Sequence, residues 1–134
     1  MNLSKSLKPL EDLFLLVYRI GISLSLMTHG FPKFQRLLNG DMKFGNPIGI
    51  GETPTFILAV LTEFIAPLLI ILGFFSRVSA FFTMCTMFVI FMVVHGQDAY
   101  GDKEIAAIYF LAFAVLLFLG PGKYSIGSKS AKAN

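Results

Sequence analysis

Four long apolar stretches take up most of the chain, and they constrain its fold more than any other feature. They run over about residues 10–30, 54–75, 78–94 and 105–119. A bilayer core about 30 Å thick needs roughly 20 apolar residues in a helix to cross it. Arg19 interrupts the first stretch and Glu63 the second, whereas the third and fourth carry no charge. The pattern therefore predicts an all-α, polytopic membrane protein built as a four-transmembrane-helix bundle.

The composition excludes the other broad classes. Only 14% of the 134 residues are charged and the mean hydropathy is +0.73, whereas a typical soluble domain is about 25% charged. A soluble domain of this size needs a polar surface that these residues cannot supply, and disordered chains are far more polar. The length predicts one transmembrane domain over residues 1–124, followed by a short basic cytoplasmic tail at 125–134.

The distribution of basic residues predicts which ends face the cytoplasm. Four spans put both termini on the same side of the membrane. Six basic residues fall on the side of the termini and four on the other side: Lys5, Lys8, Arg77, Lys123, Lys129 and Lys132 against Lys33, Arg36, Lys43 and Lys103. Cytoplasmic loops are enriched in Lys and Arg. The count favours a multi-pass protein of the inner (plasma) membrane with both termini in the cytoplasm.

One charged pair is expected in the middle of the membrane. Arg19 and Glu63 each lie nine residues, about 13 Å, from the start of their stretch, at 1.5 Å per helical residue. Antiparallel helices would then bring them to a similar depth, so we expect an Arg19–Glu63 salt bridge. Pro67 lies four residues after Glu63 and leaves the Glu63 carbonyl without its helical partner. The pair either fixes helix register or forms a proton- or ligand-linked site.

A second polar cluster is expected at the end of the bundle opposite the termini. It would comprise the residues that end the first and third stretches, or open the fourth: His29, Lys33, His95, Gln97, Asp98 and Glu104. These side chains could meet headgroups and water, or bind the carbonyl oxygen of a ligand such as a quinone. Two histidines on two helices are compatible with a haem, but nothing in the spacing calls for one, and we expect no metal site. The lone cysteine, Cys85, is expected to be a buried, inert thiol.

The order of several short motifs resembles the DoxX family of small four-helix integral membrane proteins. The matching pieces are YRIG at 18–21, HGFPKF at 29–34, TEFI at 62–65, LGFFSR at 72–77, HG at 95–96, Glu104, and GPGKYS at 120–125. The resemblance implies a four-helix membrane bundle. It also implies a connection to membrane redox systems, since the family is named after a small subunit of a quinone-reducing system that acts on sulfur compounds. With one cysteine, this chain departs from two-cysteine thiol oxidases.

The expected role is a small, non-catalytic subunit or partner of a membrane-associated, quinone-linked oxidoreductase complex. In that reading Arg19 and Glu63 form the central polar site, and the second cluster lines its mouth. The first alternative is a small-molecule or proton-coupled transporter, for which a homodimer is expected. The second is an assembly or scaffolding protein without a ligand. The expected partners are the lipid bilayer and a redox protein, and no nucleic acid.

Overall fold

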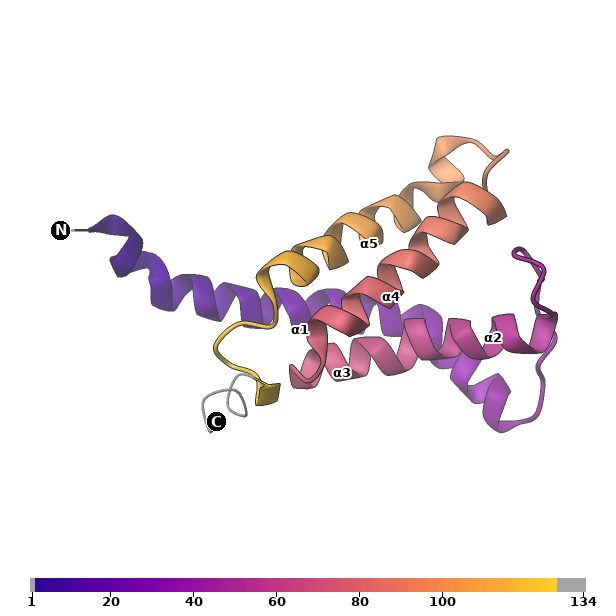
Figure 1. Cartoon of the computed structure of the whole chain (residues 1–134), viewed down its shortest axis with the longest axis horizontal. Helices are drawn as coiled ribbons and strands as arrows, with labels where there is room; N and C mark the ends of the chain where they lie inside the picture. Colours follow the sequence, from indigo (N-terminus) through magenta and orange to yellow (C-terminus); the bar gives the residue numbers. More distant parts are fainter. Residues whose placement is uncertain (1, 128–134) are drawn as a thin grey trace.

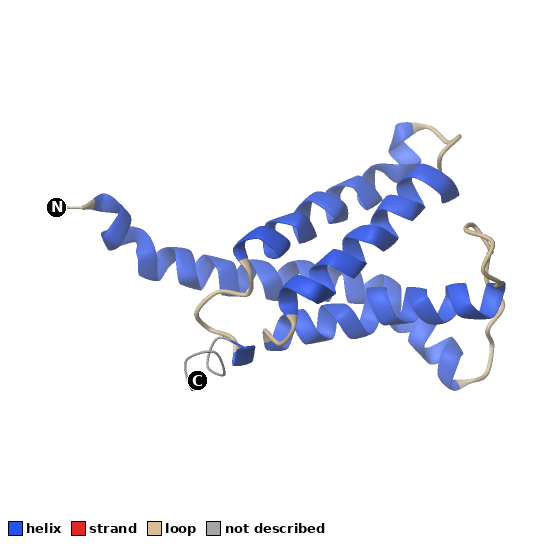
Figure 2. Ribbon diagram, in the orientation of Figure 1, coloured by secondary structure: helices blue, strands red, loops and turns tan. Residues whose placement is uncertain are grey.

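The computed structural model describes residues 2–127, which form helices joined by short loops and contain no strand (Figures 1 and 2). The first helix is α1 (Leu3–Leu38). The second is continuous through α2 (Glu52–Val60), the π-helical turn η1 (Leu61–Ile65) and α3 (Ala66–Leu72). The third runs through α4 (Ser76–Val89) and the π-helical turn η2 (Ile90–Val94), and the fourth is α5 (Tyr100–Leu119).

The four long helices run alternately in opposite directions. In Figure 1, α1 begins and α5 ends on the left, and the chain reverses on the right between α1 and α2 and again between η2 and α5. The helices at Glu52–Leu72 and Ser76–Val94 are long and apolar enough to cross a membrane, by length and composition. This arrangement agrees with the predicted all-helical class, and these two helices agree with the predicted spans.

The first helix is much longer than the predicted stretch of 10–30. It begins at Leu3 and continues through Pro32 to Leu38. A proline removes one backbone hydrogen bond and often ends a helix, but here the helix persists for two further turns and ends at Asn39, before Gly40 with φ +77°. The connection to α2 is therefore residues 39–51, about half as long as the sequence suggested.

The helices pack around a core of mixed aliphatic and aromatic side chains. Leu26, Ile70, Phe113 and Leu116 are all 0–1% exposed. Large apolar side chains also cover the outer surface. In the helix Ser76–Val94, only 22% of the most apolar 18-residue segment is buried. A soluble protein exposes few contiguous apolar patches of that extent, so the outer surface is suited to lipid.

The reversal between α3 and α4 is tight and sterically specific. Gly73 has φ +75° and Phe75 has φ +50°. A Cβ atom on Gly73 would lie 2.2 Å from the Cβ of Ser125, so only glycine fits. The Gly127 amide donates to the Gly73 carbonyl at 3.0 Å. The segment after α5 therefore folds back onto the end of α3.

Candidate functional site

Arg19 is buried, 3% exposed, and its hydrogen-bond partners within residues 2–127 are all backbone carbonyls. Its Nε donates to Ile70 O at 3.1 Å and its Nη2 to Ile71 O at 3.3 Å, both near the end of α3. The guanidinium also donates to Pro121 O at 2.6 Å and to Tyr124 O at 2.5 Å. The last carbonyls of a helix lack intrahelical partners and attract cations. Arg19 thus joins α1, the end of α3 and the segment after α5.

The predicted direct pair between Arg19 and Glu63 is therefore wrong. The reason is helix register. A Cβ on Gly30 would lie 2.2 Å from the Glu63 carbonyl oxygen, so Gly30 is the α1 residue that faces Glu63. Arg19 lies eleven residues earlier, about 16 Å along the helix. The predicted depth of Arg19 was counted from residue 10, on the expectation that the helix ends near residue 30. The helix continues past Pro32 to Leu38, and Gly30, not Arg19, lies at the level of Glu63.

The partner of Glu63 is Lys33. The Lys33 ammonium donates to a Glu63 carboxylate oxygen at 2.5 Å, and the two side chains are 24% and 5% exposed. Lys33 follows Gly30 by three residues, so both lie on the same face of α1. The close backbone approach at Gly30 brings Lys33 within reach of Glu63. The sequence predicted Arg19 as the partner of Glu63 and assigned Lys33 to the separate polar cluster, so this ion pair corrects both predictions.

A cavity of about 500 Å³ lies beside this pair. Helix α2–η1 forms one wall, and helix α4–η2 forms the other. The two helices separate toward the end at which α2 begins and η2 ends (Figure 1). Most of the lining is apolar, for example Leu58, Val89 and Ile90, and the polar groups are few. An apolar cavity with a few convergent polar groups is the usual form of a small-molecule site.

Both walls of the cavity contain a π-helical turn. The turn η1 supplies Thr62 and Glu63, and η2 supplies Ile90 and Val94. A π-helical turn is rare and is often found at a functional site. Pro67, in the first turn of α3, is the one sequence signal of this irregularity.

Hydroxyl groups close the narrow side of the cavity. Thr86 Oγ1 donates to Thr62 Oγ1 at 2.8 Å, and Thr83 Oγ1 donates to the Thr62 carbonyl at 3.0 Å. Thr62 Oγ1 donates in turn to Leu58 O at 2.9 Å. These bonds tie α4 to η1 where both pass the cavity. They also satisfy a backbone carbonyl within the irregular turn, which an apolar environment requires.

The connection 39–51, here called the strap, covers one side of the cavity. Phe44, Pro47 and Ile48 line it, and the Phe44 ring lies 5.4 Å from that of Phe56 and 5.8 Å from the Lys33 ammonium. The base of the strap is held by Arg36, which pairs with Asp41 at 3.0 Å and also donates to the Lys43 carbonyl. The Arg36 hydrogen bond, helped by the Lys43 amide, lowers the pKa of Asp41 below its ordinary value of 3.8.

The structure brings some of the predicted cluster to the cavity and leaves the rest outside. His95 and Lys33 line it. Asp98 contacts the His95 ring at 2.8 Å from an exposed position. His29 is exposed and packs edge-on against Tyr109, with 6.0 Å between ring centroids. Gln97 and Glu104 are exposed at the end of the molecule.

Cys85 was misjudged from the sequence. It lies on α4, is exposed, and lines the cavity. Thr86 and the strap residues were also missed as site residues. Threonine in an apolar stretch carries little signal, and the role of the strap depends on how far α1 continues. Within residues 2–127 no group of three or more His, Cys, Asp or Glu side chains is placed to hold a metal ion.

Comparison with known proteins places these features in a family. The DoxX family model matches residues 14–96, which include Arg19, Gly30, Lys33, Glu63 and His95. The chain is 31% identical over 126 residues to the inner membrane protein YqjF of Escherichia coli K12, covering 90% of this chain and 94% of that protein. It is 29% identical over 134 residues to an uncharacterized protein of Haemophilus influenzae, covering 95% and 98% of the two chains. No solved structure matches. The chain is a member of the DoxX family of membrane proteins.

Proposed function

We propose that this protein binds the polar head of a membrane-dissolved amphiphile, with a quinone as the preferred class, in the cavity beside Lys33 and Glu63. It would act as a non-catalytic subunit or partner of a membrane redox system. The observation that carries the proposal is the position of one buried ion pair at the polar end of an otherwise apolar cavity of about 500 Å³. Cavities of this volume are within the range that binds small molecules.

The ion pair offers both kinds of hydrogen bond that a quinone and its reduced form require. An ammonium group donates and a carboxylate accepts. Lys33 can donate to a quinone carbonyl, and Glu63 can accept from a quinol hydroxyl. Within residues 2–127, the hydrogen bond between Lys33 and Glu63 uses one ammonium donor and one carboxylate oxygen. Thr86 and the ring of His95 are further polar groups on the cavity lining.

The cysteine content of the chain supports a role as the partner of a redox protein. Cys85 is the only cysteine, so an intrachain disulfide cannot store electrons here. A quinone bound beside Lys33 would supply the redox chemistry, and this chain would bind and orient it. A partner protein would supply or receive the electrons.

The proposal includes a topology. All four helices would cross the inner membrane, with both termini in the cytoplasm, as the six-to-four distribution of basic residues favours. Reporter fusions at residue 127 and within the strap test it. A cytoplasmic reporter should be active at residue 127, and an external reporter should be active in the strap. The reverse pattern would contradict the proposed orientation.

One observation favours proton-coupled transport of a small molecule as a second candidate. The Lys33–Glu63 pair joins α1 to the irregular turn η1 between apolar helices, and ionisable pairs inside membranes often relay protons. Purified protein in liposomes with a pH-sensitive dye distinguishes this candidate. Proton uptake that requires Glu63 would favour it, whereas transport-inactive protein with bound quinone would favour the first proposal.

The direct experiment is extraction of quinones from the protein purified in mild detergent, followed by mass spectrometry. Wild type should retain a near-stoichiometric quinone, and Lys33→Met and Glu63→Gln should lose most of it. Lys103→Met is the matched control, because Lys103 lies at the same end of the molecule, packs over Phe91 at 4.8 Å and does not line the cavity. Equal retention in all four proteins would contradict the proposal.

A further inference from the structure

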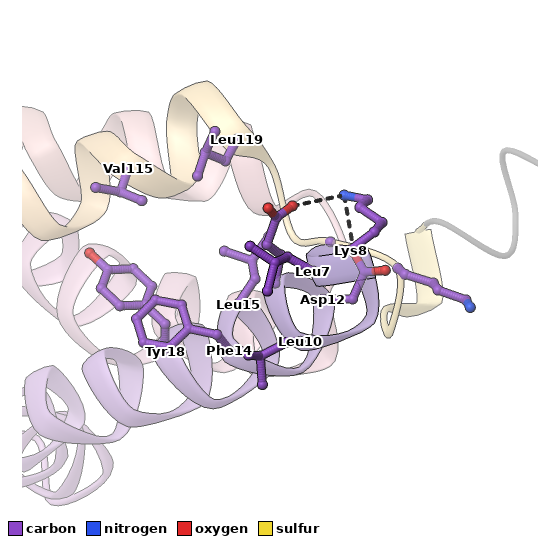
Figure 3. Close-up of a pocket in the computed structure, with 12 residues that line it drawn as sticks. Leu7, Lys8, Leu10, Asp12, Phe14, Leu15, Tyr18, Val115 and Leu119 are labelled. Atoms are coloured by element: carbon purple, nitrogen blue, oxygen red, sulfur yellow. Dashed lines mark ion pairs between the residues drawn. The ribbon is translucent and has the colours of Figure 1, made fainter. Parts of the chain in front are cut away.

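A second, larger groove lies at the opposite end of the molecule. It has a volume of about 960 Å³ and runs between the first half of α1 and the last turns of α5 (Figure 3). Its walls are mostly apolar, with Leu10, Phe14 and Leu15 on α1 and Val115 and Leu119 on α5. The groove shares none of its lining residues with the Lys33–Glu63 cavity.

Charged groups gather at one end of this groove. Lys8 pairs with Asp12 at 3.3 Å and lies 4.0 Å from Glu11, as the dashed lines in Figure 3 show. The Glu11 side chain is 59% exposed. Lys123 makes no ion pair with any carboxylate of residues 2–127, and its ammonium lies 5.7 Å from the Tyr124 ring. Among residues 2–127, the groove end therefore presents one ammonium without a carboxylate partner, that of Lys123, and one carboxylate held only at 4.0 Å, that of Glu11.

The length of the groove matches one leaflet of a bilayer. From Lys8 at the charged end to Tyr18 at the inner end there are ten residues of α1, which span about 15 Å. Half of a hydrocarbon core about 30 Å thick has the same length. A membrane-spanning helix of a second copy would be about twice as long as this groove. A single lipid, with its head at the charged end and an acyl chain along the apolar walls, has the required length and polarity.

We propose that this groove binds one phospholipid with a zwitterionic, amine-bearing headgroup, with its phosphate on Lys123 and its ammonium on Glu11. The acyl chain would lie along Phe14, Val115 and Leu119. The proposal rests on the membrane-spanning arrangement of α1 and α5 proposed above, and it does not depend on a ligand at Lys33 and Glu63. Because Arg19 anchors the segment that carries Lys123, the lipid would also brace the end of the bundle.

The test is titration of the full-length protein in detergent with phosphatidylethanolamine, followed by native mass spectrometry. Wild type should bind one lipid. Lys123→Ala should bind about fivefold more weakly, the change expected for one lysine at a lipid surface. Val115→Trp, which fills the groove, should abolish binding. Lys103→Ala, at the opposite end of the molecule, is the matched control and should bind as wild type.

Phosphatidylglycerol provides the headgroup control. Wild type should prefer phosphatidylethanolamine, and Glu11→Gln should remove that preference. Stronger binding of phosphatidylglycerol by wild type would overturn the assigned headgroup, and unchanged binding by Val115→Trp would overturn the groove. Lys33→Met should bind lipid as wild type does, so the failure of the quinone proposal and the failure of this one give different results.

Discussion

Arg19 and the Lys33–Glu63 pair are both buried charges in apolar helices, but their surroundings differ in kind. Arg19 has five N–H donors, and its four hydrogen bonds all go to backbone carbonyls at a helix end and a turn. Lys33 and Glu63 share one hydrogen bond beside a cavity. A buried charge whose bonds are nearly saturated by the backbone holds segments together. A buried pair with unused capacity beside a cavity is available to a ligand.

The largest expected effect comes from removing Arg19, whose N–H donors are nearly all used in hydrogen bonds to the backbone. Arg19→Leu leaves four carbonyls at the end of α3 and after α5 without their donor, and buried unsatisfied groups are costly. We expect a loss of about 3–5 kcal/mol in unfolding free energy, measured by thermal unfolding in detergent. Arg36→Leu, which removes a half-exposed arginine paired with Asp41 near the surface, should cost only about 1 kcal/mol. Comparable stability of Arg19→Leu and wild type would remove the distinction between the two regions.

The ion pair should show coupling that Arg19 does not. Lys33→Met or Glu63→Gln alone leaves the other group without its partner, whereas the double variant leaves neither. We expect a coupling of about 1–3 kcal/mol in a double-mutant cycle on unfolding, with partial solvent access of Lys33 keeping it moderate. Arg19→Leu combined with Glu63→Gln should be additive. Coupling between Arg19 and Glu63 would show that the two regions act as one.

Two glycines on α1 test whether the backbone of α1 must lie close to the backbone at Glu63. Gly30→Ala places a Cβ 2.2 Å from the Glu63 carbonyl oxygen, whereas Gly21→Ala meets nothing within 4 Å. Overpacking should cost about 1–2 kcal/mol at position 30, and the same change at position 21 should be neutral or stabilising by up to about 1 kcal/mol. Gly30→Ala should also weaken quinone retention, since it moves Lys33 from Glu63. Equal effects at both positions would refute the assigned register.

The smallest expected effect concerns the strap and its dependence on pH. The pKa of Asp41 is lower in the folded protein than its ordinary value of 3.8. Its contribution is therefore present above that value and is lost as the pH falls through the folded pKa. Hydrogen exchange at residues 41–46, corrected for the intrinsic rate, should increase below that pH in wild type. Asp41→Asn should show the faster exchange at neutral pH, with no further acid dependence from this group.

The sequence predicted the helical class and the family, but the partner that it predicted for Glu63, Arg19, is wrong. It did not identify the partner of Glu63, because that depends on where α1 ends. The predicted stretch ends near residue 30, yet packing of Gly30 on the Glu63 carbonyl and the cation–π contacts of Lys33 and Arg36 accompany two further helical turns past Pro32. Tertiary contacts of this kind have no signature in a single sequence. Pro67 did mark the irregular backbone at Glu63.

The π-helical turn at Leu61–Ile65 has a consequence for how family members can diverge. Such a turn holds one residue more than the α-helix it interrupts, and each helical residue turns the chain by about 100°. Deleting one residue there would keep an apolar span of nearly full length and rotate Thr62 and Glu63 relative to α3. We therefore expect relatives with a one-residue gap in this segment to insert and fold but to lose the placement of Thr62 and Glu63 on the cavity wall, so the presence of this residue would distinguish members that can keep the cavity from those that cannot.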